Sequence, residues 1–168
     1  MPPAANPAGV TPDGGLAAAM QALAGATFIS RGDDSGTHKR ELALWAAAGI
    51  ELDDTNRQET GQGMGATLNI ADQKGAYTLT DRASYLALRE NLELVVLFEG
   101  DTLLLNIYHA YLVNPEAHGG INERQARAFI EFLVAPQTQA AIGAFGVEEF
   151  GRPLFIPDAG KTVESLAE

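Results

Sequence analysis

The feature that most constrains the fold of this chain is a short apolar strand followed by a polar turn and a helix. Residues 26–30 are rich in β-branched and aromatic side chains, which favours a strand. Polar residues 31–35 follow, and Gly36 or Thr37 begins a helix that runs to about Ala48. A strand, a turn and a helix in this order make a βα unit, so the sequence predicts an α/β fold.

The rest of the chain continues this alternation of short elements. Residues 1–15 are rich in Pro, Gly and Ala and predict a linker or a mobile N-terminus. Residues 51–62 are polar and are expected to form a loop, and the C-terminal end is expected to be irregular. Apolar spacing and capping residues predict helices at 16–23, 63–74, 81–88, 122–133 and 136–145, and strands at 76–80, 92–98 and 107–113. The helix at 122–133 has the clearest amphipathic pattern.

The charge balance of the chain limits its partners. There are 22 acidic and 11 basic residues, which give a net charge of −11 in a chain of 168 residues. Such a chain lacks a basic surface that would release counterions from phosphates, so we expect no nucleic acid and no anionic membrane surface as a partner. A small anion remains compatible, because nearby donors decide its binding and distant charge is screened beyond about 8 Å.

Composition also narrows the chemistry. Hydrophobic residues make up 46% of the chain, so a packed core is expected. Cysteine is absent and His38, His109 and His118 lack zinc-site spacing, so we expect neither a metal nor a cofactor. No apolar run reaches the roughly 18 residues of a membrane span. The first residues lack the basic and apolar regions of a signal peptide, which predicts either a cytoplasmic protein or a leader that has been removed.

The segment that carries chemistry is RGDDSGTH, residues 31–38, at the start of the predicted helix. A helix start leaves its first backbone N–H groups unpaired and carries about half a positive charge. Ser35 and Thr37 add hydroxyl donors there, and Gly36 lets a ligand approach the backbone closely. Arg31 adds a planar fork of donors. These groups together predict a binding pocket for a tetrahedral oxyanion.

Asp33 is expected to support this pocket. A carboxylate beside Arg31 holds the guanidinium in place and offsets part of its charge, so hydrogen bonds and fixed dipoles dominate the binding. The same residues also fit a simpler structure, in which Ser35 or Asp34 caps the helix and Arg31 and Asp33 form a surface ion pair. His38 fits a position that covers the ligand or a surface position on this helix, and the surface position is the one predicted.

An enzymatic alternative comes from Asp34-Ser35-Gly36-Thr37, which matches the Asp-Ser/Thr-Gly-Ser/Thr signature of aspartic proteases. That signature needs apolar residues before the aspartate, whereas polar residues 31–33 precede it here. Such enzymes also need a second catalytic aspartate in a matching site, and we find none in the sequence. We find no pair of nucleophile and base either, so we predict a binding protein and not an enzyme.

The motif Arg31-x-Asp33-x-Ser35-Gly36-Thr37 resembles the anion-binding motif of periplasmic phosphate-binding proteins. Three longer strings resemble more closely the tungstate-binding proteins of ABC importers, namely FISRGDDSGTHK (28–39), GQGMGATLNIA (61–71) and KGAYTLTDR (74–82). The resemblance runs from about residue 6 to 155. It implies the type II periplasmic-binding fold, which has two α/β lobes joined by two crossovers and an anion in the cleft between them.

The resemblance also implies roles for individual residues. It assigns Arg31, Ser35, Gly36 and Thr37 to the anion and makes Asp33 the partner of the arginine. The second glycine-rich helix start is expected to face the cleft as well, through Gly63, Gly65 and Thr67. Close packing explains such a glycine-rich start equally well.

The resemblance further predicts how the chain is organised. Members of the family begin with another lobe-forming half, whose Thr/Ser-rich loop supplies the opposite ligands. We expect residues 16–107 to form one complete anion-binding lobe and 108–168 to form a crossover and C-terminal helices of an incomplete other lobe. Completion would then come from a missing N-terminal half or from a second chain.

The expected function is capture of an oxyanion for an ABC transporter permease, on the periplasmic or extracellular side of a membrane. A pocket made only of donors suits tungstate, molybdate and sulfate, whereas monohydrogen phosphate also needs an acceptor. The resemblance, and not the spacing of the residues, places tungstate first and molybdate next. An oxyanion-sensing regulatory domain is the alternative.

Overall fold

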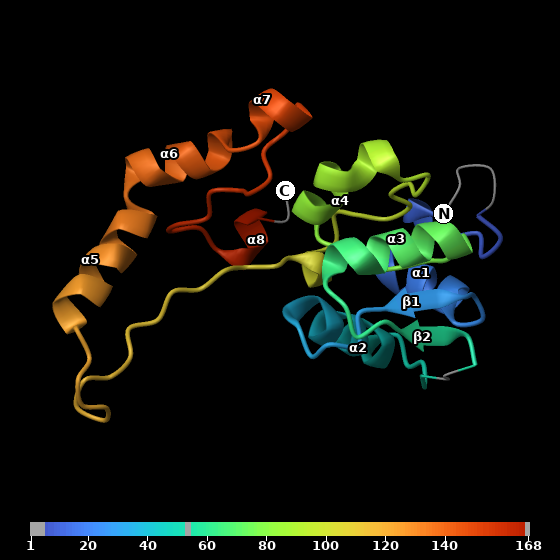
Figure 1. Cartoon of the computed structure of the whole chain (residues 1–168), viewed down its shortest axis with the longest axis horizontal. Coiled ribbons are helices and arrows are strands. Elements are labelled where there is room, and N and C mark those ends of the chain that lie inside the picture. The colour runs from blue at the N-terminus through green and yellow to red at the C-terminus, as the bar shows by residue number, and fades with distance from the viewer. Residues whose placement is uncertain (1–5, 53–54, 167–168) are drawn as a thin grey trace. The chain divides into compact units, whose positions relative to one another are not determined.

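The computed structural model describes residues 6–52 and 55–166 and divides the chain into two compact units, Met1–Leu104 and Leu105–Glu168. The division lies close to the predicted lobe boundary at residue 107. Figure 1 labels the elements in chain order. The first unit contains the 3-10 helices η1 (Pro12–Gly14), η2 (Arg89–Asn91) and η3 (Thr102–Leu104), the helices α1 (Gly15–Leu23), α2 (Gly36–Ala47), α3 (Met64–Lys74) and α4 (Arg82–Leu88), and the strands β1 (Phe28–Ser30) and β2 (Arg57–Glu59). The second unit contains α5 (Glu123–Val134), α6 (Pro136–Ala144), α7 (Val147–Phe150) and α8 (Val163–Leu166).

A small parallel sheet organises the first unit. β1 pairs with β2 in parallel, with Phe28 opposite Arg57 and Ser30 opposite Glu59. On its other side, Phe28 forms a parallel bridge with Tyr77. Three parallel segments therefore lie side by side, and they lead into α2, α3 and α4 respectively. This repeated βα connection confirms the predicted α/β class.

The core of the described chain lies in the first unit. Its buried hydrophobic residues come from the N-terminal stretch, α1, β1, α2, α3, α4 and the segments around Tyr77 and Leu94. Phe28 of β1 packs edge-to-face on Trp45 of α2, with ring centroids 5.3 Å apart. α3 packs on β1, and Figure 1 shows it running along the strands. The core therefore fixes the starts of α2 and α3 relative to the strand ends.

The predicted helices are confirmed, and their ends follow the residues expected to cap them. The Ser35 hydroxyl accepts from the backbone N–H of His38 at the start of α2. The Asp81 carboxylate accepts from the N–H of Ser84, 2.8 Å away, at the start of α4. Gly75 ends α3 in the left-handed conformation, with a φ of 57°.

Three predicted strands are absent from the described chain. Their backbones bond to side chains or lack a neighbouring strand to pair with. At 76–80 only Tyr77 joins the sheet, since the Thr78 hydroxyl occupies the Ile29 carbonyl that would continue the ladder. At 92–98 the Asp72 carboxylate accepts from two backbone N–H groups, those of residues 93 and 94, at 2.8 and 3.1 Å. At 107–113 the segment is extended and exposed, with Tyr111 80% exposed.

The predicted loop at 51–62 contains a strand, so that prediction was wrong for β2. The sequence Arg57-Gln58-Glu59 has no apolar residue and gives no strand signal. Arg57 is nonetheless buried, because its charge is paired inside the unit. Residues 53 and 54 lie outside the described residues.

The N-terminal stretch also differs from the prediction of a linker or mobile terminus. Val10 is only 5% exposed and belongs to the core. The Asn6 side chain bonds the backbone of Val10 and accepts from the Tyr77 hydroxyl, 3.0 Å away, which in turn accepts from the N–H of Ala8. Residues 6–15 are therefore tied to the first unit, and residues 1–5 lie outside the described part.

The second unit is built from helices that leave apolar side chains exposed. None of the buried hydrophobic residues of the described chain belongs to it. On α5, Phe129 is 59% exposed and Phe132 is 57% exposed. α5 packs on α6, where the Gln139 amide donates to the Leu133 carbonyl at 2.8 Å. None of the helices in the described ranges is long and apolar enough to cross a lipid bilayer.

Candidate anion-binding site

The predicted anion motif lies at the edge of the sheet where the parallel strands end. β1 ends at Ser30, and residues 31–35 connect it to the first turn of α2. The neighbouring loop after β2 is tied to this connection, because the Thr60 N–H donates to the Ser30 carbonyl and the Gly61 N–H donates to the Arg31 carbonyl. Ligands of open α/β sheets bind at this edge.

Arg31 and Asp33 are in contact, as the sequence predicts. The Arg31 Nη2 donates to Asp33 Oδ2, and their side chains are 18% and 21% exposed. The Arg31 Nε atom is buried and has no hydrogen-bond partner among the described residues. A buried guanidinium N–H without an acceptor costs free energy, so this N–H is suited to donate to an anion or a water.

The first turn of α2 supplies further donors. The Ser35 hydroxyl caps the helix, so the simpler prediction of a capped helix is confirmed for Ser35. The N–H groups of Gly36 and Thr37 stand in the first turn, where the helix offers them no acceptor. A Cβ added to Gly36 would meet nothing within 4 Å, so the backbone there is open to an incoming group. Capping and anion binding are compatible, because they use different N–H groups.

Hydrogen bonding lowers the pKa of the Asp33 carboxyl below its ordinary value of 3.8. The largest cause is the side chain of Ser35, and the Ser35 backbone N–H and the Arg31 guanidinium add to it, while burial acts in the opposite direction. Because the folded pKa lies below the unfolded one, this interaction stabilises the folded loop above pH 3.8 and is lost as the pH falls through the lowered value.

Replacing Ser35 with Ala should raise the pKa of Asp33 toward 3.8, because the largest stabilising contact of its carboxylate is removed. The titration of the Asp33 side-chain carboxyl carbon, followed by NMR from pH 6 downwards, measures this change. Thr37→Ala serves as the control, since no contact joins its hydroxyl to Asp33. An unchanged midpoint in Ser35→Ala would contradict the assigned cause.

A buried polar network lies beneath the motif, and sequence reasoning missed it. Glu41 of α2 is 2% exposed, and its Oε1 accepts from the Arg57 Nε at 2.9 Å. Its Oε2 accepts from the Ser30 hydroxyl at 2.6 Å, and the same hydroxyl accepts from Arg57 Nη2 at 2.9 Å. The Arg57 Nη1 donates to Glu59 at 2.8 Å. These bonds join α2, β1 and β2 directly below the loop.

Charge pairing governs the protonation of this network. Desolvation by burial is the largest influence on the pKa of Arg57 and lowers it, but hydrogen bonds with Glu41 and Glu59 outweigh it and raise that pKa above its ordinary range. Arg57 therefore stays charged, and it forms salt bridges with the carboxylates of Glu41 and Glu59 below the loop. The free guanidinium N–H at this edge belongs to Arg31.

The second glycine-rich helix start makes contacts of the close-packing kind at Thr67 and Gly65, and its role at a cleft stays a prediction. Thr67 is fully buried, and its hydroxyl contacts the Gly63 carbonyl at 3.1 Å and the Thr60 hydroxyl at 3.0 Å. A Cβ on Gly65 would lie 3.5 Å from Leu88 of α4. Thr67 therefore packs inside the unit, and the half-buried Gly65 faces α4. Gly63, the N-cap of α3, is open and stands at the same sheet edge as the motif.

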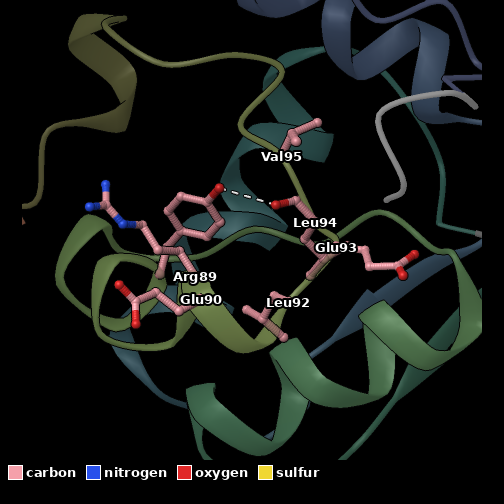
Figure 2. Close-up of a pocket in the computed structure, with 7 residues that line it drawn as sticks. Arg89, Glu90, Leu92, Glu93, Leu94 and Val95 are labelled. Atoms are coloured by element: carbon pink, nitrogen blue, oxygen red, sulfur yellow. Dashed lines mark hydrogen bonds between the residues drawn. The ribbon is translucent and has the colours of Figure 1, made fainter.

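A hollow lined by residues of α4, η2 and the segment after it offers another cavity in the first unit, shown in Figure 2. Its lining includes the carboxylates of Glu90 and Glu93, which point away from each other in the figure. The Tyr85 hydroxyl uses its proton on the Leu94 carbonyl, 3.1 Å away. Arg89 also lines the hollow, but it stands beside these two carboxylates, so the lining is not the donor-only set that an anion needs.

An α/β unit whose parallel strands lead into helix starts and donors at one sheet edge is a ligand-binding architecture. The chain belongs to the PBP superfamily: residues 6–137 match the family described as a PBP superfamily domain. This range covers the first unit from Asn6 onwards and extends through α5.

Proteins named for tungstate are among the relatives. The chain is 46% identical over 134 residues to the tungstate-binding protein TupA of Peptoclostridium acidaminophilum, covering 80% of this chain and 47% of that protein. The structure of a tungstate-binding protein TupA from Desulfovibrio alaskensis G20 is 41% identical, with a TM-score of 0.75 over 94% of this chain and 65% of that chain. The structure of a tungstate ABC transporter from Geobacter sulfurreducens is 37% identical, with a TM-score of 0.63 over 79% of this chain and 57% of that chain.

The chain spans about half the length of the curated relatives it matches. It spans 57–65% of the two solved structures described above. The matched part includes the anion motif, the buried network below it and the second helix start, because residues 6–137 contain all three.

Proposed function

We propose that this chain supplies one side of the anion site of a solute-binding protein that serves an ABC importer. The ligand is a tetrahedral oxyanion, tungstate first and molybdate next. Arg31, Ser35, Gly36 and Thr37 contact the anion, and Asp33 orients the arginine. The protein acts by binding and release, without catalysis and without a metal or cofactor.

The observation that carries the proposal is the buried Arg31 Nε, which has no partner in the described part of the chain, beside an open helix start. An oxyanion at this place would accept from the Nε and from the backbone N–H groups of α2. Asp33 leaves these donors free, because it uses another nitrogen of the guanidinium. The names of the relatives favour tungstate over other oxyanions.

The proposal includes the organisation and place of the protein. The first unit is the anion-binding lobe, and the second unit provides a crossover and helices of another lobe, whose remaining part supplies the opposite ligands. The protein works on the periplasmic or extracellular side and meets the membrane through the permease. The exposed apolar side chains of α5 support this division, because the described residues of the second unit include no buried hydrophobic core for them to join.

Calorimetric titration with tungstate, molybdate, sulfate and phosphate tests the function. We expect heat with tungstate and molybdate and a weaker response to sulfate, with phosphate last because a site made of donors leaves its proton without an acceptor. Each anion is titrated into this chain and into a chimera that adds the unmatched part of the Peptoclostridium relative. Silence of both proteins with all four anions would overturn the proposal, whereas heat from the chimera alone would place the remaining ligands in the added part.

A further inference from the structure

The connection between β1 and α2 has an unusual backbone. Gly32 has a φ of 60° and Asp34 has a φ of 58°, and both values lie in the left-handed region. A Cβ on Gly32 would lie 2.5 Å from the Cβ of Glu59, so the loop runs directly over the end of β2. Asp34 is not a glycine, and its left-handed conformation costs free energy that a neighbouring contact must offset.

One side chain makes such a contact with the Asp34 backbone. The Asp34 N–H donates to Nδ1 of His38, 3.1 Å away. The Asp34 carboxylate also approaches Lys39, but these side chains are 84% and 64% exposed, so their ion pair contributes little. His38 itself is 12% exposed at its side chain, which contradicts the predicted surface position. The ring is therefore mostly covered, with the Asp34 backbone at one edge and Arg57 at the other.

The other edge of the ring faces the buried network. His38 Nε2 lies 3.2 Å from Arg57 Nη2 and 3.7 Å from Glu59 Oε1. A neutral imidazole has one accepting nitrogen, so it cannot accept from both Asp34 and Arg57. The tautomer that accepts on Nδ1 carries its proton on Nε2, toward the Glu59 carboxylate. In that tautomer His38 Nε2 and Arg57 Nη2 are both donors, so they form no hydrogen bond with each other.

We propose that His38 is a positioning residue that holds Asp34 in the left-handed conformation, and that it thereby sets the shape of the anion loop. The part of this inference that concerns anion affinity rests on the proposed function. The Asp34 N–H donates to Nδ1 of the His38 ring, and the other edge of the ring lies near Glu59 and Arg57. Asp34 in turn stands between the Arg31–Asp33 pair and the donors of the helix start. His38 acts without touching the anion.

Three variants of His38 separate this role from simple packing. The amide oxygen of Asn can occupy the place of Nδ1, that of Gln can reach the place of Nε2, and Leu offers neither acceptor. We expect the Asp34 amide to exchange its hydrogen about tenfold faster in His38→Leu and His38→Gln than in the unmodified chain, and at a near-normal rate in His38→Asn. NMR hydrogen exchange measures these rates without any anion. His118→Leu, an exposed histidine in the second unit, is the control.

Each outcome of the exchange experiment decides the inference. The proposed role of His38 would be overturned if the Asp34 amide exchanged equally slowly in the unmodified chain and in His38→Leu. It would also be overturned if His38→Asn and His38→Gln lost the same amount of exchange protection at Asp34. If thermal melting shows that His38→Leu does not fold, the comparison of His38→Asn with His38→Gln still decides, because both keep a polar amide.

The effect on binding is tested separately by tungstate titration. We expect His38→Leu to weaken the affinity for tungstate about tenfold. His38→Asn should have most of the normal affinity, because the Asn amide oxygen still accepts from the Asp34 N–H. If the Asp34 amide exchanges faster in His38→Leu but the affinity for tungstate stays normal, the link between His38 and anion binding would be overturned. If the unmodified protein and the chimera both bind no anion, the proposed function fails, whereas the exchange rates still decide whether His38 holds the loop.

Discussion

Replacing Arg57 with Ala should lower the free energy of unfolding of the first unit by about 3–5 kcal/mol. The substitution leaves the Glu41 carboxylate buried, with its side chain 3% exposed and without a cation. It also removes the bond from Arg57 to the Ser30 hydroxyl. An unpaired buried charge costs much more than the pair contributes, so the loss exceeds that of an ordinary hydrogen bond.

Urea unfolding followed by tryptophan fluorescence measures this loss. Trp45 is the single tryptophan of the chain, and its indole N–H lies 3.3 Å from Glu41 Oε1, so its emission reports on the first unit. The matched control is Arg82→Ala, which removes an exposed ion pair with Glu99 at 3.6 Å and should cost about 0.5 kcal/mol or less.

The double replacement Glu41→Leu with Arg57→Met gives a sharper test of the same physics. Both charges are then absent, so the penalty for an unpaired carboxylate disappears and most of the lost stability should return. A single Arg57→Ala variant that loses less than about 1 kcal/mol would show that the Glu41 carboxylate is solvated or finds another donor once the arginine is removed.

Replacing Arg31 with Ala should weaken tungstate binding by about 1.5–3 kcal/mol, which is roughly a ten- to hundredfold rise in the dissociation constant. The arginine supplies a charge-assisted donor from a largely buried side chain, and none of the residues that the structure describes accepts from its Nε. Arg31→Lys should recover only part of the affinity, because an ammonium keeps the charge but loses the planar fork of donors.

Calorimetric titration of whichever protein binds tungstate, the chain or the chimera, measures this change. Arg127→Ala is the control, since it removes a positive charge of α5 in the second unit, where the arginine pairs with Glu123 of the same helix. The melting temperature of each variant is recorded to separate loss of binding from loss of folding. An unchanged affinity in Arg31→Ala would show that the arginine is not a ligand.

Local sequence signals located most of the helices and the predicted motif. Ser35, Gly75 and Asp81 mark helix ends through bonds to residues a few positions away, and such bonds depend on sequence alone. The contact between Arg31 and Asp33 is equally local. The assignment of Arg31 and its neighbours as anion ligands stays a prediction.

Long-range contacts explain what the sequence did not reveal. Glu41 and Arg57 are buried by pairing with each other across a separation of 16 residues, and each resembles a surface charge in the sequence. The same pairing buries the polar strand β2, which lacks the apolar residues of a strand. The segments at 92–98 and 107–113 have strand-like side chains, but strands form only where a neighbouring backbone is available.

The sequence by itself determined the βα order, the helix limits and the presence of a donor-rich loop. Periodicity, caps and short-range contacts depend only on residues that are close together in the sequence. Only the tertiary structure decided that His38 is enclosed, that Thr67 faces inward and that a buried ion pair supports the loop. Burial depends on which distant segments pack together, and it determines whether a polar side chain meets water, a ligand or another charge.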